Sequence, residues 1–353
     1  MSNSGAHKTG VLLVNLGSPA STKTSDVRRF LREFLGDPRV VNLPRPLWWL
    51  ILKLFVLPFR PRKSAHAYQS IWTEQGSPLI VFTRRLSDKL AARLAGDDIR
   101  VDHAMRYGQP ALAEKLQQFQ QQGVDDIVIV PLYPQYSSTT TASVFDVVAK
   151  VFLEWRYLPS LRFISDFHSR PAYIQAIADS VRDYWQQHGQ SQLLMMSFHG
   201  LPARLTELGD PYFYQCQASG RLIAENLGLA DDQWQLVFQS RFGKAEWLQP
   251  YTAPTLEEWG AKGVRRVDVI CPGFVADCLE TLEEIAQEGR DDFLRAGGRE
   301  YHYIPALNED DAWIEALADL AEQHLAGWPT RTVADPQALE TSARQASKFG
   351  ATS

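Results

Sequence analysis

Eight short runs rich in Val, Ile and Leu alternate along the chain with segments that have a helical period, such as 110–122, 172–187 and 276–287. The runs cover residues 11–19, 99–110, 126–136, 161–167 (the weakest), 193–202, 235–243, 266–274 and 301–307. Near-continuous apolar runs that alternate with helices are typical of parallel strands covered on both faces. The pattern therefore predicts an α/β protein built from βαβ units.

The two halves of the chain repeat this pattern. In each half the first three strong runs end in a polar residue beside Gly or Pro. The likeness predicts two similar Rossmann-like domains, each a doubly wound parallel sheet, over residues 1–160 and 161–329, with a cleft between them. Because ligands of such sheets bind beyond the carboxyl ends of the strands, we expect the functional residues in the turns that follow the runs.

Two segments stand outside this repeat. Residues 330–353 are polar and have no period, so we expect a disordered tail there. The longest apolar run, 47–57, contains Lys53 and is shorter than the roughly 20 residues that span a bilayer. It is either a buried helix or part of an apolar lip, over about residues 44–60, that admits an apolar ligand and touches a membrane interface, where Trp is favoured.

Composition narrows the function. Lys+Arg 36 and Asp+Glu 41 give a formal net charge of −5, so no basic field favours a nucleic-acid partner. The 3 cysteines are too few to disulfide-bond a framework or to supply the four thiolates of an iron–sulfur cluster from one chain. With no signal-peptide pattern in the first ten residues, we expect a cytoplasmic protein. No dinucleotide or P-loop glycine motif occurs, which removes the strongest signals for nucleotide binding.

A histidine directly follows the apolar run that begins at Leu193. His199, followed by Gly200 and Pro202, lies at the carboxyl end of a predicted central strand and therefore at the predicted cleft. A neutral imidazole there can act as a base, bind a metal, or donate to a turn carbonyl as an ordinary core residue. The sequence leaves these alternatives open.

An acidic motif, CPGFVADCLETLEEI, covers residues 271–285, with a helix predicted to begin near Val275. At about 100° per residue, the acidic positions of this helix share a wedge of about 80°. These positions are Asp277, Glu280, Glu284 and Glu288. A cation that offsets their repulsion would explain the pattern, and so would an amphipathic helix with a solvated acidic face. Together with an imidazole at the same cleft, such carboxylates suit a divalent metal such as Fe²⁺.

Aromatic, hydroxyl and cationic side chains gather in the other predicted strand-end turns. Among them are Arg106, Tyr107, Tyr133, Tyr136, Ser137, Ser138, Phe242 and Trp247. Aromatic rings supply flat contact area and Arg pairs with carboxylates, so these turns suit a broad, planar, anionic ligand. The alternative is that the aromatic residues only cap the core.

These segments, in this order, resemble the ferrochelatase family. SFHGLP at 197–202 resembles the histidine motif of the family, and the segment at 271–285 resembles its acidic motif. Further matches are NLGSP at 15–19, RYGQP at 106–110, PLYPQYSSTTT at 131–141 and FQSRFGKAEWLQPYT at 238–252. The resemblance covers roughly residues 9–327.

The resemblance implies a lyase of the chelatase fold that inserts Fe²⁺ into protoporphyrin IX to give protohaem, by distortion of the macrocycle, pyrrole deprotonation and carboxylate-guided metal delivery. It implies that His199 and Glu280 are catalytic, face each other across the macrocycle and bind the iron, with Asp277 and Glu284 continuing the metal path. It also implies a porphyrin pocket lined by Asn15, Gly17, Ser18, Arg106, Tyr107, Tyr136, Ser137, Ser240, Trp247 and Phe274.

The resemblance also sets expectations for cofactors and partners. Some family members ligate a [2Fe–2S] cluster near the C-terminus, but no cysteine follows Cys278 here, so we expect no cluster and no permanently bound cofactor. We expect peripheral contact with the inner membrane face and transient contact with the preceding enzyme of haem synthesis. The alternatives are a chelatase for coproporphyrin or another tetrapyrrole, or a porphyrin or haem carrier without catalysis. Coproporphyrin, with four propionates, demands more cationic contacts, so the apolar lip favours protoporphyrin.

Overall fold

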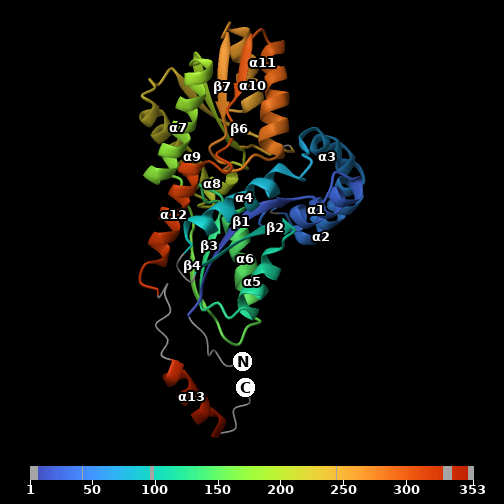
Figure 1. Ribbon diagram of the computed structural model, residues 1–353. Helices are drawn as coiled ribbons and strands as arrows, with labels where there is room; N and C mark the ends of the chain where they lie inside the picture. The colour runs from blue at the N-terminus through green and yellow to red at the C-terminus, as the bar shows by residue number, and fades with distance from the viewer. Residues whose placement is uncertain (1–6, 42, 96–98, 244, 329–335, 349–353) are drawn as a thin grey trace.

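The computed structural model describes residues 7–41, 43–95, 99–243, 245–328 and 336–348. Within these ranges, eight strands form two parallel sheets of four strands each (Figure 1). The first sheet contains β1 (Thr9–Ser18), β2 (Ile99–Gly108), β3 (Asp126–Pro131) and β4 (Ser160–Phe163). The second contains β5 (Leu193–His199), β6 (Trp234–Gln239), β7 (Arg266–Ile270) and β8 (Glu300–Tyr303). Every apolar run contains a strand, which confirms the predicted fold class.

Both sheets have the same topology. The strand order is β2-β1-β3-β4 in the first sheet and β6-β5-β7-β8 in the second, and all neighbouring strands pair in parallel. β1 and β5 therefore occupy equivalent central positions. The repeated pattern of runs in the sequence corresponds to a repeated order of strands in space.

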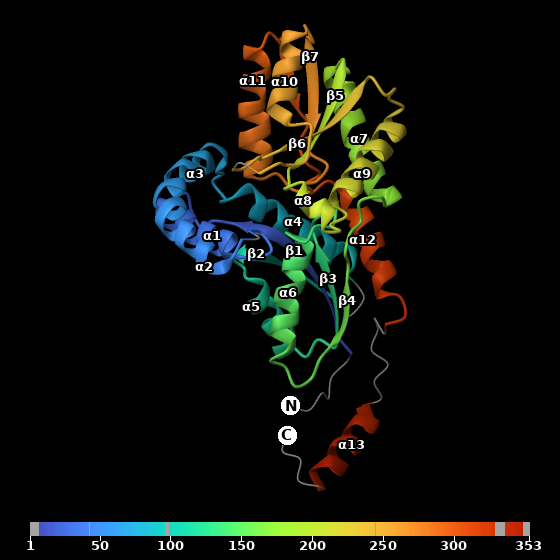
Figure 2. The same ribbon diagram turned by 180° about the vertical axis from the view of Figure 1, so that it is seen from behind.

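Helices cover both faces of each sheet, as the two opposite views in Figures 1 and 2 show. The helices of the first half are α1 (Thr24–Gly36), α2 (Arg45–Ile51), the π-helix η1 (Leu52–Val56), α3 (Leu57–Ile71), α4 (Pro78–Arg93), α5 (Leu112–Gln121) and α6 (Thr141–Phe152). Those of the second half are α7 (Pro171–His188), α8 (Arg204–Glu207), α9 (Tyr212–Leu227), α10 (Thr252–Ala261), the π-helix η2 (Glu280–Gly289), α11 (Arg290–Arg295), α12 (Asp311–Leu325) and α13 (Pro336–Lys348).

The alternation of strand side chains explains why both faces are covered. Successive residues of a strand point to opposite faces of its sheet. Val11 and Leu13 of β1 join a core cluster that includes apolar residues of α4, whereas Leu12 and Val14 join a cluster with α5 and α6. A strand that is apolar at consecutive positions is therefore buried on both sides.

The two halves share one core cluster, and the first sheet extends past residue 160. β4 pairs with β3, so the first sheet extends to Phe163, beyond the predicted boundary. One core cluster contains residues of both sheets, including Val128 of β3 and Phe198 of β5. Helix α12 of the second half packs against α4 of the first half, and Arg85 of α4 pairs at 2.9 Å with Glu309, which precedes α12. A short, half-exposed strand such as β4 carries a weak hydrophobic signal, and the division of the chain into two domains stays a prediction.

The C-terminal segment differs from the expected disordered tail over residues 336–348, which form helix α13. Arg344 and Glu340, one helical turn apart, form an ion pair at 3.6 Å on its surface. Residues 330–335 and 349–353 of the predicted tail lie outside the described residues. In the described part of the chain, no helix has the length and apolar character needed to cross a membrane.

Candidate active site

His199 is the last residue of β5 and is half-buried. Its Nδ1 atom lies 2.6 Å from the carbonyl oxygen of Gly200. Because a carbonyl oxygen only accepts hydrogen bonds, Nδ1 carries the proton, and Nε2 of the neutral ring has the free electron pair. The hydroxyl of Tyr212 donates to the backbone oxygen of His199 at 3.0 Å. The strand end and these two hydrogen bonds thus hold an imidazole whose Nε2 can accept a proton or bind a metal.

Two aromatic side chains lie at this strand end. The ring of Phe274 lies 6.5 Å from the His199 ring, measured between centroids. Trp247 lies against Gly200, where a Cβ atom would come within 3.2 Å of the indole and 2.5 Å of the Gln239 carbonyl oxygen. Only glycine fits this close approach at residue 200. The predicted site residues Phe274 and Trp247 therefore lie next to His199 and Gly200, respectively.

Glu284 lies near His199 and is anchored by the end of β6. Its carboxylate accepts hydrogen bonds from the Ser240 backbone nitrogen at 2.6 Å and from the Ser240 hydroxyl at 2.5 Å. Gln239 donates a longer bond, 3.3 Å. Burial raises the pKa of Glu284, although the bonds from Ser240 and the charge of His199 oppose this effect. The structure thus joins two predicted site residues, Ser240 and Glu284, in one contact.

Glu280 begins helix η2 and faces helix α3 of the first half. Its backbone oxygen accepts a hydrogen bond from Gln239 at 2.8 Å. Burial lowers the pKa of the Arg60 guanidinium and the charge of Glu280 opposes this shift, so the two side chains are close. Tyr68 also lies near Glu280: burial and then the Glu280 charge raise its pKa, while the neighbouring Ser18 hydroxyl opposes the rise. Both halves therefore contribute to the surroundings of Glu280.

The contacts of Asp277 differ from those of Glu280 and Glu284. It is 4% exposed, and its carboxylate accepts hydrogen bonds from Tyr303 at 2.6 Å, Asn308 at 2.7 Å and Thr281 at 2.9 Å. The regular helix begins at Glu280, not near Val275, and has the i→i+5 hydrogen bonds of a π-helix. The angular wedge calculated for an α-helix therefore does not describe this segment.

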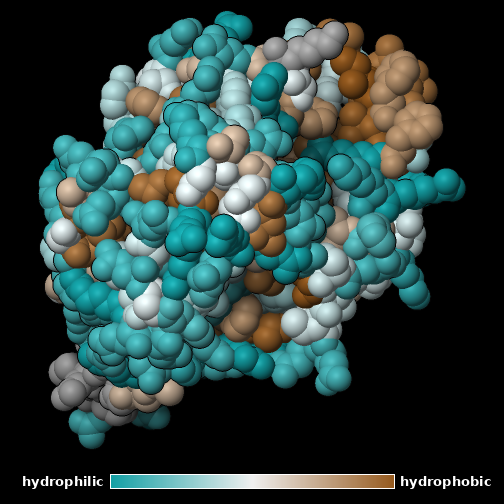
Figure 3. All heavy atoms as spheres, turned by 90° about the horizontal axis from the view of Figure 1, so that it is seen from above, coloured by the Kyte–Doolittle hydropathy of each residue, from teal (hydrophilic) through white to brown (hydrophobic). Residues whose placement is uncertain are grey.

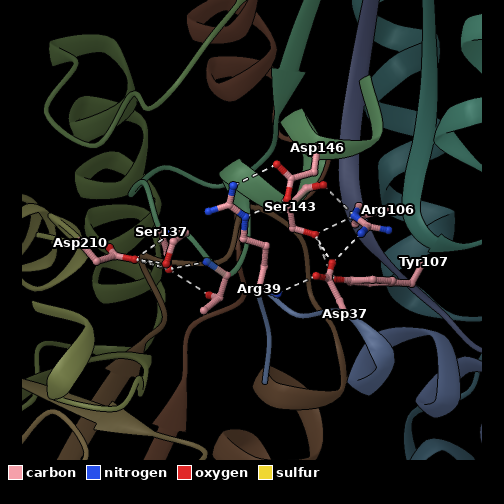
Figure 4. A network of polar contacts seen from close by, with 10 residues as sticks. Asp37, Arg39, Arg106, Tyr107, Ser137, Ser143, Asp146 and Asp210 are labelled. Carbon is pink, nitrogen blue, oxygen red and sulfur yellow. Dashed lines mark hydrogen bonds and ion pairs between the residues drawn. The ribbon is translucent and has the colours of Figure 1, made fainter. Parts of the chain in front are cut away.

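A buried carboxylate holds Arg106 and Tyr107, as Figure 4 shows. The Asp37 carboxylate accepts bonds from Arg106 at 2.5 Å, Ser143 at 2.5 Å and Tyr107 at 2.8 Å. Burial alone would raise the pKa of Asp37, but hydrogen bonds from Ser143, Tyr107 and the Arg39 backbone, with the Arg106 charge, lower it below its ordinary value. The structure therefore places two predicted pocket residues in a polar network that joins α1, β2 and α6.

The remaining predicted pocket residues make contacts within the protein. Asn15 donates to Thr83 at 3.0 Å, and the Ser137 hydroxyl donates to Asp210 of the second half at 3.1 Å (Figure 4). The backbone nitrogen of Tyr136 donates to a glutamine of α9 at 2.6 Å. At Gly17, whose φ is +106°, a Cβ atom would lie 1.8 Å from a β2 carbonyl oxygen, so the two strands require glycine there. Contacts of these residues with a porphyrin stay predictions.

The sequence analysis missed Asp37, Arg60, Tyr68 and Gln239. Gln239 directly precedes Ser240 and ends a strand, so its position was a usable signal. Arg60 is a cation at the end of an apolar segment, whereas Asp37 and Tyr68 carry no local pattern that marks them. In the ranges that the structure describes, no three His, Cys, Asp or Glu side chains are grouped to hold a metal ion.

The sequence left two alternatives for the apolar run at 47–57, a buried helix or an apolar lip, and the run is buried on one side and exposed on the other. Trp48 and Leu52 are buried against α1 and α3, whereas Trp49 and Phe55 of the run and Phe59, two residues beyond it, are 56%, 64% and 72% exposed. Figure 3 shows hydrophobic side chains gathered at the edge where Figure 1 places α1–α3. An open hollow of about 510 Å³ there is lined by Arg45, Pro46, Trp49 and Leu50.

Comparisons with known proteins agree with the motifs. The ferrochelatase family model matches residues 8–325. The chain is 59% identical to a ferrochelatase of Dechloromonas aromatica (strain RCB), over 97% of this chain and 95% of that protein, and 54% identical to one of Herminiimonas arsenicoxydans, over 94% and 90%. Its fold is similar to SirB from Bacillus subtilis with Fe³⁺, with a TM-score of 0.54 and 12% identity over 90% of this chain and 96% of that one. The chain belongs to the ferrochelatase family.

Proposed function

We propose that the site around His199, Glu280 and Glu284 inserts Fe²⁺ into protoporphyrin IX. Membership of the ferrochelatase family makes the chain a lyase that inserts iron into a porphyrin in haem synthesis. The observation that carries the proposed site is that an imidazole with a free Nε2, at the end of β5, lies near the half-buried carboxylate of Glu284, which is anchored to the end of β6. Glu280 lies one π-helical turn away and faces the first half.

Insertion requires that two pyrrole protons leave as the metal enters. His199 Nε2 accepts one, because its other ring nitrogen already donates to Gly200. Glu284 is suited to accept the second, because burial raises its pKa and so makes the carboxylate a stronger base than an exposed one. The phenyl and indole rings of Phe274 and Trp247 supply flat apolar contact for the macrocycle. Binding that favours a bent macrocycle would expose the nitrogen lone pairs to the metal.

The acidic residues differ in the roles that their contacts support. Glu280 and Glu284 are half-buried and suit the exchange of waters on an incoming Fe²⁺ for carboxylate oxygens. Asp277, assigned to the same path by resemblance, already accepts three hydrogen bonds from side chains. We propose that it supports the helix and does not itself bind the metal. Fe²⁺ is then a substrate, and the 3 cysteines are too few to supply the four thiolates of an iron–sulfur cluster from one chain.

The substrate class is tested by mixing the purified protein with Fe²⁺ and porphyrin without oxygen. We expect protoporphyrin to be converted to protohaem at least about tenfold faster than coproporphyrin is converted to its iron complex. The exposed side chains of the lip, Trp49, Phe55 and Phe59, are apolar, so two further propionates would lose hydration there. The Glu280→Gln variant is expected to insert iron more slowly than the wild type at limiting Fe²⁺ but to bind protoporphyrin with normal affinity. Binding without conversion by the wild type would identify a carrier, and faster conversion of coproporphyrin would contradict the assigned substrate.

We further propose that the apolar lip rests on an anionic membrane surface. The exposed rings of Trp49, Phe55 and Phe59 lie in a segment, residues 38–73, that contains no Asp or Glu. Its cations are Arg39, Arg45, Lys53, Arg60, Arg62 and Lys63. Apolar rings with basic neighbours are typical of interfacial segments. Contact with the preceding enzyme and a cytoplasmic location stay predictions.

The lip is tested by sedimentation with lipid vesicles. We expect the triple variant Trp49→Ser, Phe55→Ser and Phe59→Ser to lose at least about tenfold in affinity for vesicles rich in phosphatidylglycerol, since each buried ring contributes about 1.5–3 kcal/mol. Leu153→Ser is the matched control, because Leu153 is 87% exposed but lies outside the lip, at the C-terminal end of α6. Equal binding by wild type and triple variant would reject the membrane role.

A further inference from the structure

Asn308 is held in an unusual backbone conformation beside the acidic motif. Its φ is +49°, in the left-handed region that asparagine tolerates better than most other residues. In this conformation its backbone nitrogen donates to the Val275 oxygen at 2.8 Å. Its side chain donates to the Asp277 carboxylate at 2.7 Å and accepts from the Asp277 backbone nitrogen at 2.8 Å. Asn308 therefore fixes both the backbone and the side chain of Asp277.

Asp277 passes this constraint to helix η2. Its carboxylate accepts a hydrogen bond from Thr281, at 2.9 Å, and the Thr281 hydroxyl also accepts from the backbone nitrogen of Cys278 at 3.0 Å. Thr281 is fully buried and directly follows Glu280. The position of Asp277 therefore sets the first turn of η2, which carries Glu280 and leads to Glu284.

Neutral groups alone hold the charge of Asp277. Within the described ranges the carboxylate has no ion pair, and its hydrogen bonds come from Tyr303, Thr281, Asn308 and, at 3.5 Å, the Ala306 nitrogen. A buried carboxylate that loses one of these hydrogen-bond donors destabilises the folded protein, unless it moves to reach a different donor. Loss of the Asn308 amide would therefore displace the start of η2.

The residues after Asn308 fix this segment to the rest of the molecule. Glu309 pairs with Arg85 of α4 at 2.9 Å, and Asp311 pairs with Lys89 of the same helix at 2.8 Å. Asp310 caps α12 by accepting from the backbone nitrogen of its second residue at 2.9 Å. Asn308 thus belongs to a segment that is tied to the first half of the chain. The first turn of η2 is positioned relative to both halves.

We infer that Asn308 is a positioning residue for metal delivery. Through Asp277 it holds Glu280 and Glu284 where they meet the incoming Fe²⁺, while it touches neither the metal nor the porphyrin. This inference rests on the proposed roles of Glu280 and Glu284. It assigns to Asn308 an effect on the use of iron that is larger than its effect on porphyrin binding.

The first test is Asn308→Gly, which keeps the left-handed backbone accessible and removes only the side chain. We expect the apparent KM for Fe²⁺ to rise about 10- to 100-fold, as for other residues that orient metal-binding groups, with the KM for protoporphyrin changed less than about twofold. Steady-state rates measured without oxygen at varied concentrations of each substrate give both values. Equal changes in the two KM values would overturn the inference.

A charge swap tests whether the hydrogen bond between residues 277 and 308 carries the effect. Asn308→Asp alone sets two carboxylates against each other and should raise the KM for Fe²⁺ at least as much as Asn308→Gly. Combining Asn308→Asp with Asp277→Asn restores one donor and one acceptor between the two side chains, and the carboxylate at 308 still accepts from the backbone nitrogen of residue 277. We expect the double variant to recover most of the lost iron affinity. Failure of the double variant to improve on Asn308→Asp would overturn the inference.

Two controls separate the possible failures. Asp310→Ala removes the α12 cap next to Asn308 without touching Asp277, and it should lower Tm while leaving the KM for Fe²⁺ unchanged. An equal rise in that KM would show that loss of local stability suffices and would overturn the inference. In parallel, an unchanged KM for Fe²⁺ in Glu280→Gln would overturn the proposed function. If the KM for Fe²⁺ rises in Glu280→Gln but stays normal in Asn308→Gly, only the positioning role of Asn308 would be overturned.

Discussion

Replacing His199 by alanine is expected to slow iron insertion by about 10²- to 10⁴-fold, the usual contribution of a positioned general base. The Nδ1 atom donates to Gly200, so Nε2 is the ring nitrogen that can take a pyrrole proton or bind the metal. Alanine removes that nitrogen and leaves the aromatic surroundings, Phe274 and Trp247, in place. Fluorescence titration with protoporphyrin should therefore give a Kd close to that of the wild type.

His302→Ala is a matched control for this result. His302 is also half-buried and accepts or donates a hydrogen bond with Tyr184 at 2.9 Å, but it lies on β8, in the edge strand of the second sheet. The His302→Ala variant should insert iron at the wild-type rate. Insertion by His199→Ala within a few-fold of the wild type would show that the imidazole neither accepts the proton nor binds the metal.

Replacing Asp37 by asparagine is expected to lower the free energy of unfolding by about 3–5 kcal/mol at neutral pH, because the Arg106 charge then stays buried without its partner. The Asp37 and Arg106 side chains are 4% and 14% exposed, so water does little to screen the loss. The Asp37 carboxylate, which accepts hydrogen bonds from Ser143 and Tyr107, has two acceptor oxygens, whereas the amide of asparagine has only one. Urea denaturation measures the difference.

The pH dependence of this difference has a definite sign. The folded protein lowers the pKa of Asp37 below its ordinary value of 3.8, so folding favours the charged form. The stabilisation is complete above that ordinary value and is lost as the pH falls through the lower, folded-state pKa. The gap between wild type and Asp37→Asn should therefore be constant near neutral pH and narrow on acidification below about pH 4.

Asp146→Asn is the control for a general charge effect. Asp146 pairs with Arg39 at 2.8 Å in the same region, but these side chains are 44% and 43% exposed (Figure 4). An exposed ion pair contributes about 0–1 kcal/mol, so this variant should unfold nearly as the wild type does. A loss of stability in Asp37→Asn no larger than in Asp146→Asn would contradict the buried network.

The strands and their repeat in the two halves were predictable, whereas the order of the strands in each sheet and the helical geometry of the acidic motif were not. Apolar runs such as 126–131 are continuous because both faces of a parallel sheet are covered, and this signal is local. In place of the predicted α-helix from Val275, the chain has a π-helix from Glu280, and Asp277 before it is held by Tyr303 and Asn308 of a later segment. The predicted tail similarly contained the helix α13, because alanine and ion-pair contributions are too small to stand out in a polar sequence.

The sequence by itself determined the α/β class, the repeat of two halves, and the position of His199 at a strand end, since hydrophobic periodicity and strand-end turns are properties of neighbouring residues. Only the tertiary structure decided which polar groups meet. Asp37 meets Ser143 across 106 positions, and Arg60 of the lip lies near Glu280. Hydrogen bonds and buried charges act over a few ångströms in space, and separation along the chain does not reveal which residues packing brings to that distance.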